Sequence, residues 1–247
     1  MKNQFSPLYE DTNIDELEIV RESDFSNLPE PVQKYLRLTG IIGKREIRTV
    51  ELKQKGHFRL KVNGKWISMT AIQYINVDAM GFIWKAKASI VRVLDQFVNG
   101  QGNLKVKLFG LFTVGNARGP EIDQGESLRF LAEIIWFPSA FAKEYLKWNE
   151  VDDSSSDVTL LYNDKNVTAR FHFRESGEID RITAKRYRKD QGKFSLDDWI
   201  ITDLEYKAFC GVTIPHKAHV SWKLNDSTFC YDKFEITEVS FNGDSKT

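Results

Sequence analysis

The stretch of residues 126–137, in the middle of the chain, constrains the fold more than any other part of the sequence. From Leu128 to Trp136, seven apolar side chains cover almost the whole circumference of a helical wheel, and only Arg129 and Glu133 interrupt them. A helix that is apolar nearly all round has to be buried on most sides. Pro138 is expected to end or kink this helix. The sequence therefore predicts a helix that other elements enclose.

The segments on both sides of this helix show the period of two that is typical of β-strands. On the N-terminal side, Asn63-Gly64 predicts a two-residue type I′ hairpin turn. On the C-terminal side, the alternation resumes after Trp148 and continues to Phe241. A flat sheet of about 10 to 11 strands would leave one face and both edges exposed. We therefore expect a mainly β (α+β) fold, with a large curved antiparallel sheet or open barrel of that size around one central buried helix.

A short helix is expected near the N-terminus. Asn27 and Glu30 have the spacing of a capping box, and Pro29 and Pro31 suit a first helical turn. Gly40 stands where a helix end favours a left-handed residue. The sequence thus predicts a helix that starts after Asn27 and stops at Gly40.

No linker divides the chain into two domains. Residues 1–26 are polar and acidic, and we expect them to form an arm on the surface. Residues 27–241 are expected to form a single half-barrel domain, and residues 242–247 a C-terminal tail.

Charge and hydropathy exclude some classes of function. The 35 basic and 35 acidic side chains cancel and look interspersed, so we do not expect nucleic-acid binding, which needs clustered Lys and Arg. No window approaches the roughly 20 apolar residues of a membrane span. The first residues do not resemble a signal peptide either, which favours a soluble protein in the cytoplasm.

The cysteines and histidines do not indicate a metal site. The spacing of Cys210 and Cys230 matches no zinc pattern, and either a disulfide between neighbouring strands or two buried thiols would explain them. His216 and His219 are three residues apart on a predicted strand and would point to opposite faces. No metal and no cofactor is therefore expected.

One sequence string resembles a known family. Residues 28–37, LPEPVQKYLR, followed by Gly40, resemble the LPxPVxxYLR opening motif of a bacterial family of unknown function. The resemblance continues to about residue 241 through these further matches: Gly119-Pro120-Glu121, Arg129, Glu133, Trp136-Phe137-Pro138 and Gly211-Val212-Thr213-Ile214-Pro215. It implies no catalytic residues. The order of elements is also similar to that of the lipoprotein-localisation-factor (LolA-like) half-barrels, which hold acyl chains between a curved sheet and a helical lid.

Three charged residues are the candidates for a site. Arg129 and Glu133, on an otherwise apolar helix, must either pair or face a wet cavity. They would form a buried ion pair that anchors the helix to the sheet, or a polar anchor for a ligand. Asp95 lies on the same strand face as Val93 and Phe97 and needs a donor, which Arg129 could supply. If Asp95 lay close to Glu133, repulsion would raise one pKa and create an acid–base pair.

The large aromatic side chains of the sequence could either line a cavity inside the sheet or fill its core. We expect Trp84, Trp136 and Phe171 to form an apolar wall if a cavity exists; a well-packed core is the alternative. The leading hypothesis is a non-enzymatic binder of a hydrophobic or acyl-bearing small molecule, such as a lipid, whose polar end meets the three charged residues. The alternatives are an enzyme that acts through its buried carboxylates and a scaffold for a protein partner that the sequence does not identify.

Overall fold

A computed structural model describes residues 8, 13–162, 165–224 and 227–243 of the chain. In this part of the chain one antiparallel sheet has thirteen strands in the order β6-β5-β4-β3-β2-β1-β13-β12-β11-β10-β9-β8-β7. The strands are β1 Thr49–Phe58, β2 Ile67–Asn76, β3 Gly81–Ala88, β4 Val91–Val98, β5 Gln101–Leu108, β6 Phe112–Ala117, β7 Leu146–Asp152, β8 Ser155–Leu160, β9 Val167–Phe173, β10 Ile179–Asp190, β11 Lys193–Phe209, β12 Val212–Leu224 and β13 Ser227–Phe241. Only β1 and β13 are neighbours in the sheet without being consecutive in this series.

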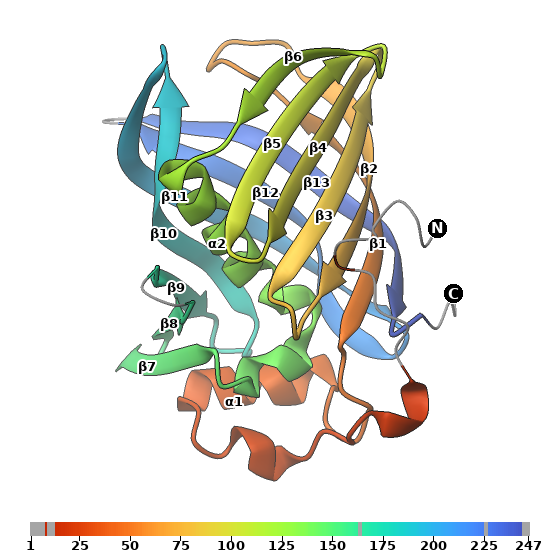
Figure 1. Ribbon diagram of the computed structural model, residues 1–247. Helices are drawn as coiled ribbons and strands as arrows, with labels where there is room; N and C mark the ends of the chain where they lie inside the picture. The colour runs from red at the N-terminus through yellow and green to blue at the C-terminus, as the bar shows by residue number, and fades with distance from the viewer. Residues whose placement is uncertain (1–7, 9–12, 163–164, 225–226, 244–247) are drawn as a thin grey trace.

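The sheet curls around the central helix, α2 Pro120–Glu133 (Figure 1). This helix connects β6 to β7, the two edge strands, and crosses the concave side of the sheet. The expected number of strands was too low. The edge strands β6 and β7 are exposed along most of their length, so no alternation of buried apolar residues marks them in the sequence.

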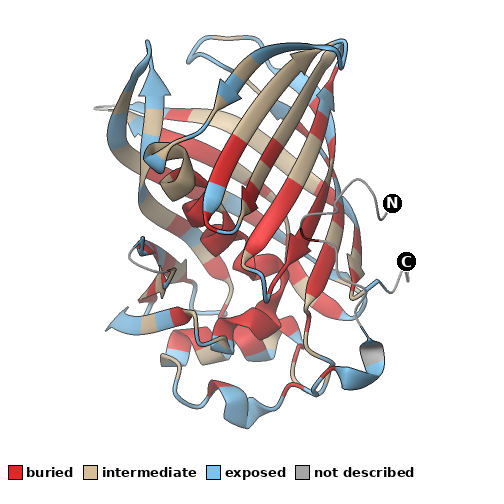
Figure 2. Cartoon of the chain, viewed as in Figure 1, coloured by how far each residue is buried: buried red, intermediate tan, exposed pale blue. Residues whose placement is uncertain are grey.

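The predicted burial of the central helix is confirmed, and Figure 2 shows a continuous buried stretch at this position. Its seven apolar side chains are all buried: Leu128, Phe130, Leu131, Ala132, Ile134, Ile135 and Trp136. The α-helix ends at Glu133, earlier than Pro138 would require. Two 3-10 turns continue the segment, η4 Ile134–Trp136 and η5 Pro138–Ala142.

A glycine in β5 allows this helix to lie directly on the sheet. A Cβ atom on Gly102 would be 2.8 Å from the carbonyl oxygen of Ile122 in α2. The N–H of Gly102 donates a hydrogen bond to Oδ1 of Asp123 at 2.8 Å, which fixes the first turns of the helix against the strand. A larger residue at position 102 would push the helix away.

The loop between β1 and β2 differs from the prediction. Residues 59–66 separate the two strands, so Asn63-Gly64 does not form a two-residue hairpin turn. Arg59 explains the difference, because its guanidinium lies 4.6 Å from the ring centre of Trp66 and its Nε donates to a carbonyl of β13 at 2.7 Å. These contacts hold a wider loop. The paired positive φ angles of a type I′ turn occur at Asn99-Gly100, with 51° and 71°.

Helix α1, Glu30–Thr39, ends as predicted at Gly40, whose φ is 68°. The predicted capping box is wrong. The N-cap is Pro29, which offers no side-chain acceptor. The backbone N–H of Gln33 donates to the carbonyl of Pro29 at 3.0 Å, and its side-chain Nε2 donates to the carbonyl of Leu28 at 2.8 Å. The two prolines that flank Glu30 fix the start of the helix without a polar cap.

Segments outside the sheet contribute to the core. Two 3-10 turns, η2 Ile14–Glu16 and η3 Glu22–Phe25, precede α1, and the side chains of Val20 and Phe25 are buried in the main core. Most of residues 1–12 and residues 244–247 of the expected tail lie outside the described part.

Cys210 and Cys230 both keep their thiols, and Cys210 is exposed at the turn between β11 and β12. The alternatives of a disulfide and of two buried thiols are therefore both wrong for Cys210. Within the described ranges, no helix has the length and the hydropathy needed to cross a bilayer.

Candidate functional site

A partly enclosed cavity of about 260 Å³ lies between the concave face of the sheet and α2. Strands β1–β5 and β10–β13 all contribute to its wall. Its ionisable and aromatic lining residues are Asp95, Glu126, Arg129, Glu133, Arg186, Asp232, Trp84, Trp136, Trp199, Tyr231 and Phe234. Four carboxyl groups thus face two guanidinium groups inside an aromatic wall.

Arg129 ties the helix to the sheet. Its Nη1 lies 2.7 Å from Oδ2 of Asp95 in β4, and its Nε lies 2.7 Å from Oε1 of Glu133 one helical turn later. The guanidinium also lies over the ring of Trp84, 5.0 Å from its centre. Burial alone would lower the pKa of Arg129, but the charges of Glu133 and Asp95 outweigh it and raise the pKa. Arg129 therefore carries its charge throughout the ordinary pH range.

Glu133 is held from two sides. Besides Arg129, Nε2 of Gln73 in β2 donates to its Oε2 at 2.5 Å. Burial raises the pKa of Glu133, and its two hydrogen-bond donors counter part of that effect. This geometry is that of a buried ion pair between helix and sheet, as one of the two sequence-based interpretations describes.

Glu126 is a second acidic residue of the helix in the cavity, and it was not among the residues predicted for the site. Its Oε1 lies 3.3 Å from Nη2 of Arg186 in β10. Its Oε2 and Oδ1 of Asp95 are both buried and have no hydrogen-bond partner among the described residues. Two ionised carboxylates cannot bond to each other, since each can only accept.

A proton on Glu126 resolves this conflict. Burial and the charge of Asp95 raise the pKa of Glu126 to about 8, and Asp95 is the side chain to which the protonated form can donate a hydrogen bond. Glu126 is therefore neutral at pH 7. The sequence left open whether Asp95 lies close enough to Glu133 to raise its pKa. Burial is the main cause of the raised pKa of Glu133 and the charge of Asp95 adds to it, but both groups bind Arg129, and Asp95 also acts on Glu126.

A bulge in β13 brings two consecutive residues to the cavity. Val220 lies opposite Asp232 and Ser221 lies opposite Cys230, so Tyr231 is an extra residue in the strand. Without this bulge Tyr231 and Asp232 would point to opposite faces. Oδ1 of Asp232 is buried without a partner in the described part, and burial raises the pKa of Asp232 to about 6.

The three tryptophans of the wall differ in their hydrogen bonds. Nε1 of Trp84 donates to Oε1 of Gln54 at 2.8 Å, and Nε1 of Trp199 donates to the hydroxyl of Tyr231 at 2.9 Å. Nε1 of Trp136 is buried and has no acceptor among the residues described. With the proton on Glu126 bonded to Asp95, the described residues leave one donor and one acceptor of the cavity lining unsatisfied, Nε1 of Trp136 and Oδ1 of Asp232.

Five of the six residues predicted for the site line the cavity: Trp84, Asp95, Arg129, Glu133 and Trp136. Phe171 is not among the lining residues. It is a buried residue of β9, and its ring centre lies 6.3 Å from that of Phe141 and 5.5 Å from that of Trp148 in β7. A role for Phe171 in ligand binding therefore has no support from its position.

The sequence contained a signal for one of the missed residues. Glu126 lies three residues before Arg129 and seven before Glu133, so the three share one side of the helix. Arg186 and Asp232 carry no comparable local signal. Their position depends on the register of β10 and on the bulge in β13, neither of which the sequence pattern reveals.

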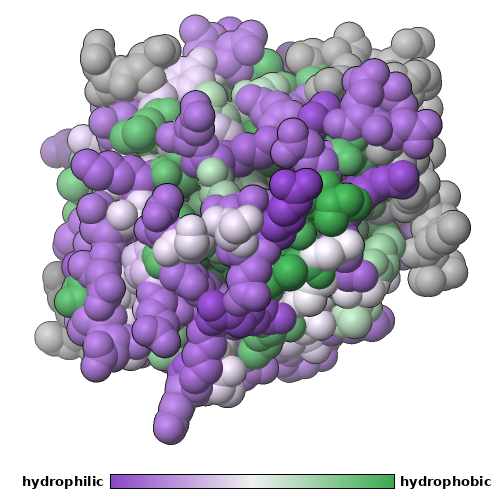
Figure 3. Space-filling view, turned by 90° about the horizontal axis from the view of Figure 1, so that it is seen from below, coloured by the Kyte–Doolittle hydropathy of each residue, from purple (hydrophilic) through white to green (hydrophobic). Residues whose placement is uncertain are grey.

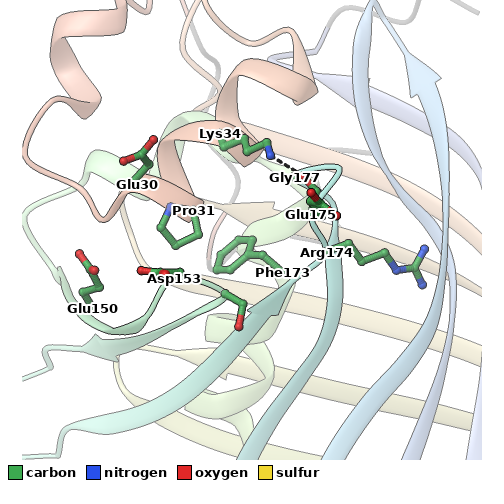
Figure 4. A pocket seen from close by; sticks show the side chains of 10 residues that line it. Glu30, Pro31, Lys34, Glu150, Asp153, Phe173, Arg174, Glu175 and Gly177 are labelled. Carbon is green, nitrogen blue, oxygen red and sulfur yellow. Dashed lines mark hydrogen bonds between the residues drawn. The ribbon is translucent and has the colours of Figure 1, made fainter.

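A second hollow, of about 510 Å³, lies between the start of α1 and the turn from β9 to β10 (Figure 4). Its charged side chains are exposed or already bonded. Lys34 donates to the carbonyl of Glu175, and Arg174 pairs with Asp180 at 3.0 Å. Hydrophilic side chains cover most of the face seen in Figure 3. This hollow is therefore a weaker candidate than the cavity beside α2.

Comparison with solved structures finds distant likenesses. A domain described as an outer membrane lipoprotein-sorting protein from Vibrio parahaemolyticus is 8% identical, with a TM-score of 0.46 over 80% of this chain and 87% of that one. A DUF1329 family protein from Desulfovibrio piger is 8% identical, with a TM-score of 0.46 over 87% and 93%. A LolA superfamily protein from Nitrosomonas europaea is 9% identical, with a TM-score of 0.43 over 85% and 93%.

No curated protein matches the sequence. A family model does match, and it covers residues 18–234, which include α2, strands β1–β12 and every residue discussed for the cavity. The chain belongs to this family, a family of unknown function (DUF6544).

Proposed function

We propose that this protein binds a small molecule with an apolar body and a cationic or hydrogen-bond-donating end in the cavity beside α2. The observation that carries the proposal is a pair of buried polar atoms in the cavity lining that no protein group satisfies among the described residues, the acceptor Oδ1 of Asp232 and the donor Nε1 of Trp136. Buried polar atoms of this kind cost stability unless a partner satisfies them. A bound ligand is the partner that we propose.

The size of the cavity limits the ligand. A cavity of about 150 Å³ holds one benzene molecule, so about 260 Å³ has room for roughly ten non-hydrogen atoms in proportion. A lipid with two acyl chains would not fit inside. The acyl-bearing ligand expected from the sequence is therefore restricted to a short chain or a ring.

The charged residues that line the cavity favour a cationic group on the ligand. Four carboxyl groups line the cavity against two guanidinium groups, and both Arg129 and Arg186 already bind carboxylates. A ligand carboxylate would add a negative charge without a free cation to meet it. An ammonium group could donate to Oδ1 of Asp232 and lie beside the aromatic wall, an environment that favours cations. The N–H of Trp136 remains for an acceptor atom of the same ligand.

Three probes of similar size test this proposal: 2-phenylethylamine, 2-phenylethanol and phenylacetate, each titrated into the protein by calorimetry at pH 7. We expect the amine to bind at least tenfold more tightly than phenylacetate, with the alcohol between them. Asp232→Asn should reduce the preference for the amine, whereas Glu144→Gln, on an exposed residue outside the cavity lining, should not. Equal binding of the three probes would refute the head-group assignment, and binding of none at millimolar concentration would refute the proposal.

A catalytic role is the second candidate, and one observation favours it. Glu126 holds a proton at neutral pH beside the carboxylate of Asp95, an arrangement suited to general acid–base chemistry. The two candidates differ in the fate of the ligand. A compound recovered with the purified protein and incubated with fresh protein should stay chemically unchanged by NMR if the protein is a binder. Its conversion, abolished by Asp95→Asn, would identify an enzyme.

A further inference from the structure

The charges of the chain are not evenly distributed, although the net charge is zero. Residues 52–119 contain eleven Lys and Arg residues but only two acidic residues, Asp78 and Asp95. Asp95 lines the inner cavity and binds Arg129. Residues 52–119 thus carry a formal charge of +9, and the rest of the chain carries the opposite. The sequence-based expectation of interspersed charges is wrong for the half of the sheet formed by β1–β6.

The strand register gathers these cations into rows. Lys87 lies opposite Arg92, and Arg92 lies opposite Lys107, so three cations stand side by side across β3, β4 and β5. Lys85 and Lys105 belong to the next row of the same face, with Leu94 between them. We call these five residues the basic face: Lys85, Lys87, Arg92, Lys105 and Lys107.

The basic face is on the convex side of the sheet. Trp84, Asp95 and Leu104 are paired across the same strands and line the inner cavity. Their neighbours along each strand therefore point outward. Neither Lys87 nor Lys107 forms an ion pair with a carboxylate in the described ranges, and Arg92 donates only to the carbonyls of Ser89 and Val91. Like charges directly opposite each other destabilise a sheet, so an anion bound from outside would stabilise this row.

Exposed apolar side chains lie at one end of the same strands. Ile90 is in the turn between β3 and β4, and Phe109, Leu111 and Phe112 are at the turn between β5 and β6. Their exposed fractions are 45%, 64%, 75% and 67%. The N–H of Phe109 donates to the carbonyl of Ile90 at 2.8 Å, so the two turns lie side by side. Both are at the top of Figure 1. We call these four residues the apolar tips.

Phe109 occupies a turn position whose backbone conformation disfavours a bulky side chain. Its φ is 53° and that of Gly110 is 73°, which is the type I′ geometry that favours Asn-Gly. A bulky side chain with positive φ is unusual. The chain keeps an exposed phenyl ring at a strained position instead, and burial in the protein core does not compensate for it. The exposed ring of Phe109 is therefore better explained by contact with a binding partner than by the stability of the fold.

We infer that the basic face and the apolar tips together dock on an anionic lipid surface. The apolar tips enter the boundary between head groups and acyl chains, and the row of Lys87, Arg92 and Lys107 meets the lipid phosphates. A nucleic-acid duplex would match the cations alone, because apolar side chains add nothing to phosphate contacts. This inference is independent of the ligand in the cavity, which lies on the opposite face of the sheet.

Vesicle flotation with the full chain tests the inference. We expect the protein to float with vesicles of phosphatidylcholine and phosphatidylglycerol at low salt, and to bind pure phosphatidylcholine much more weakly. Each basic residue near an anionic surface contributes about fivefold to the partition coefficient. The triple variant Lys87→Gln, Arg92→Gln, Lys107→Gln should therefore lower the partition coefficient about a hundredfold. Removing the like-charge row should leave its thermal stability unchanged or higher.

A substitution in the tips separates binding from folding. Phe109→Asn supplies the preferred turn residue, so we expect a higher Tm together with at least a tenfold loss of vesicle binding. The matched controls are Lys147→Gln and Val151→Asn in β7, which are exposed at the far edge of the sheet and should leave binding unchanged.

Two results would overturn the inference. One is the absence of flotation with anionic vesicles at low salt. The other is binding that heparin or duplex DNA reproduces and that Phe109→Asn leaves intact, since this would make the row a site for polyanions without a lipid surface.

Discussion

Replacing Glu126 by Gln should change how the stability of this protein depends on pH. In the folded chain burial and the charge of Asp95 raise the pKa of Glu126 from 4.5 to about 8. Between these two values the folded state holds a proton that the unfolded state has released. Stability therefore falls as the pH rises through this range. A glutamine side chain at this position can donate the same hydrogen bond to Asp95 but has no proton to lose.

The size of the effect follows from the two pKa values. One bound proton gives a slope of about 1.4 kcal/mol per pH unit, or on the order of 4 kcal/mol between pH 5 and pH 8 as an upper bound. We expect the wild type and Glu126→Gln to have similar free energies of unfolding near pH 5. At pH 8 to 9 the variant should be the more stable protein.

Urea unfolding at pH 5, 6, 7, 8 and 9 measures this difference. Asp232, whose pKa is raised to about 6, also makes the stability of the wild type depend on pH, but it is common to both proteins and cancels in the difference. Glu121→Gln in the first turn of α2 is the control and should follow the wild type. Parallel curves for the wild type and Glu126→Gln would refute the assignment of a proton to Glu126.

Two further substitutions test the packing around the cavity and the turns. Arg129→Met leaves the charges of Asp95 and Glu133 buried without their cation, and urea unfolding should show a loss of about 3–5 kcal/mol in the free energy of unfolding. The control Arg170→Met breaks an exposed pair with Asp157 and should lower the free energy of unfolding by less than about 1 kcal/mol. Equal losses in the two variants would contradict the burial of the Arg129 cluster. Gly100→Ala combines a φ of 71° with overlap between the new methyl group and the ring of Tyr162. It should lower Tm well beyond Gly43→Ala, which has a φ of 82° and open space around it, and an equal effect of the two would show that the Tyr162 contact does not restrict position 100.

The fold could be predicted as far as the sequence pattern is local. A helix with apolar residues on nearly every side needs an enclosure, and the curved sheet follows from that requirement. The prediction of a two-residue turn at Asn63-Gly64 was wrong because Arg59 stabilises a wider loop. It does so by contacting Trp66 and the carbonyl of Cys230, which is distant in the sequence. The edge strands were hard to identify because the residues of β6 and β7 are mostly exposed and have no buried face to maintain.

The candidate site was predictable to a similar extent. Arg129, Glu133 and Asp95 stand out as charges on faces that are otherwise apolar, and the structure brings them together. Asp232 reaches the cavity only through a bulge in β13, and Arg186 only through the register of β10. Such positions follow from the pairing of whole strands, which a single sequence does not encode in any short pattern.

The pairing of β1 with β13 determines how this sheet can assemble. Val50 of β1 lies opposite Phe241 of β13. During synthesis β1 can pair with β2 early, but its hydrogen bonds on the other side form only after β13 has been made. Until then a nascent chain carries an unprotected strand in what will become the centre of the sheet, and such strands pair readily with other chains. Loss of β13 alone would leave both β1 and β12 in that condition. Interruption of translation before β13 is complete is thus expected to yield an aggregating product rather than a smaller folded protein.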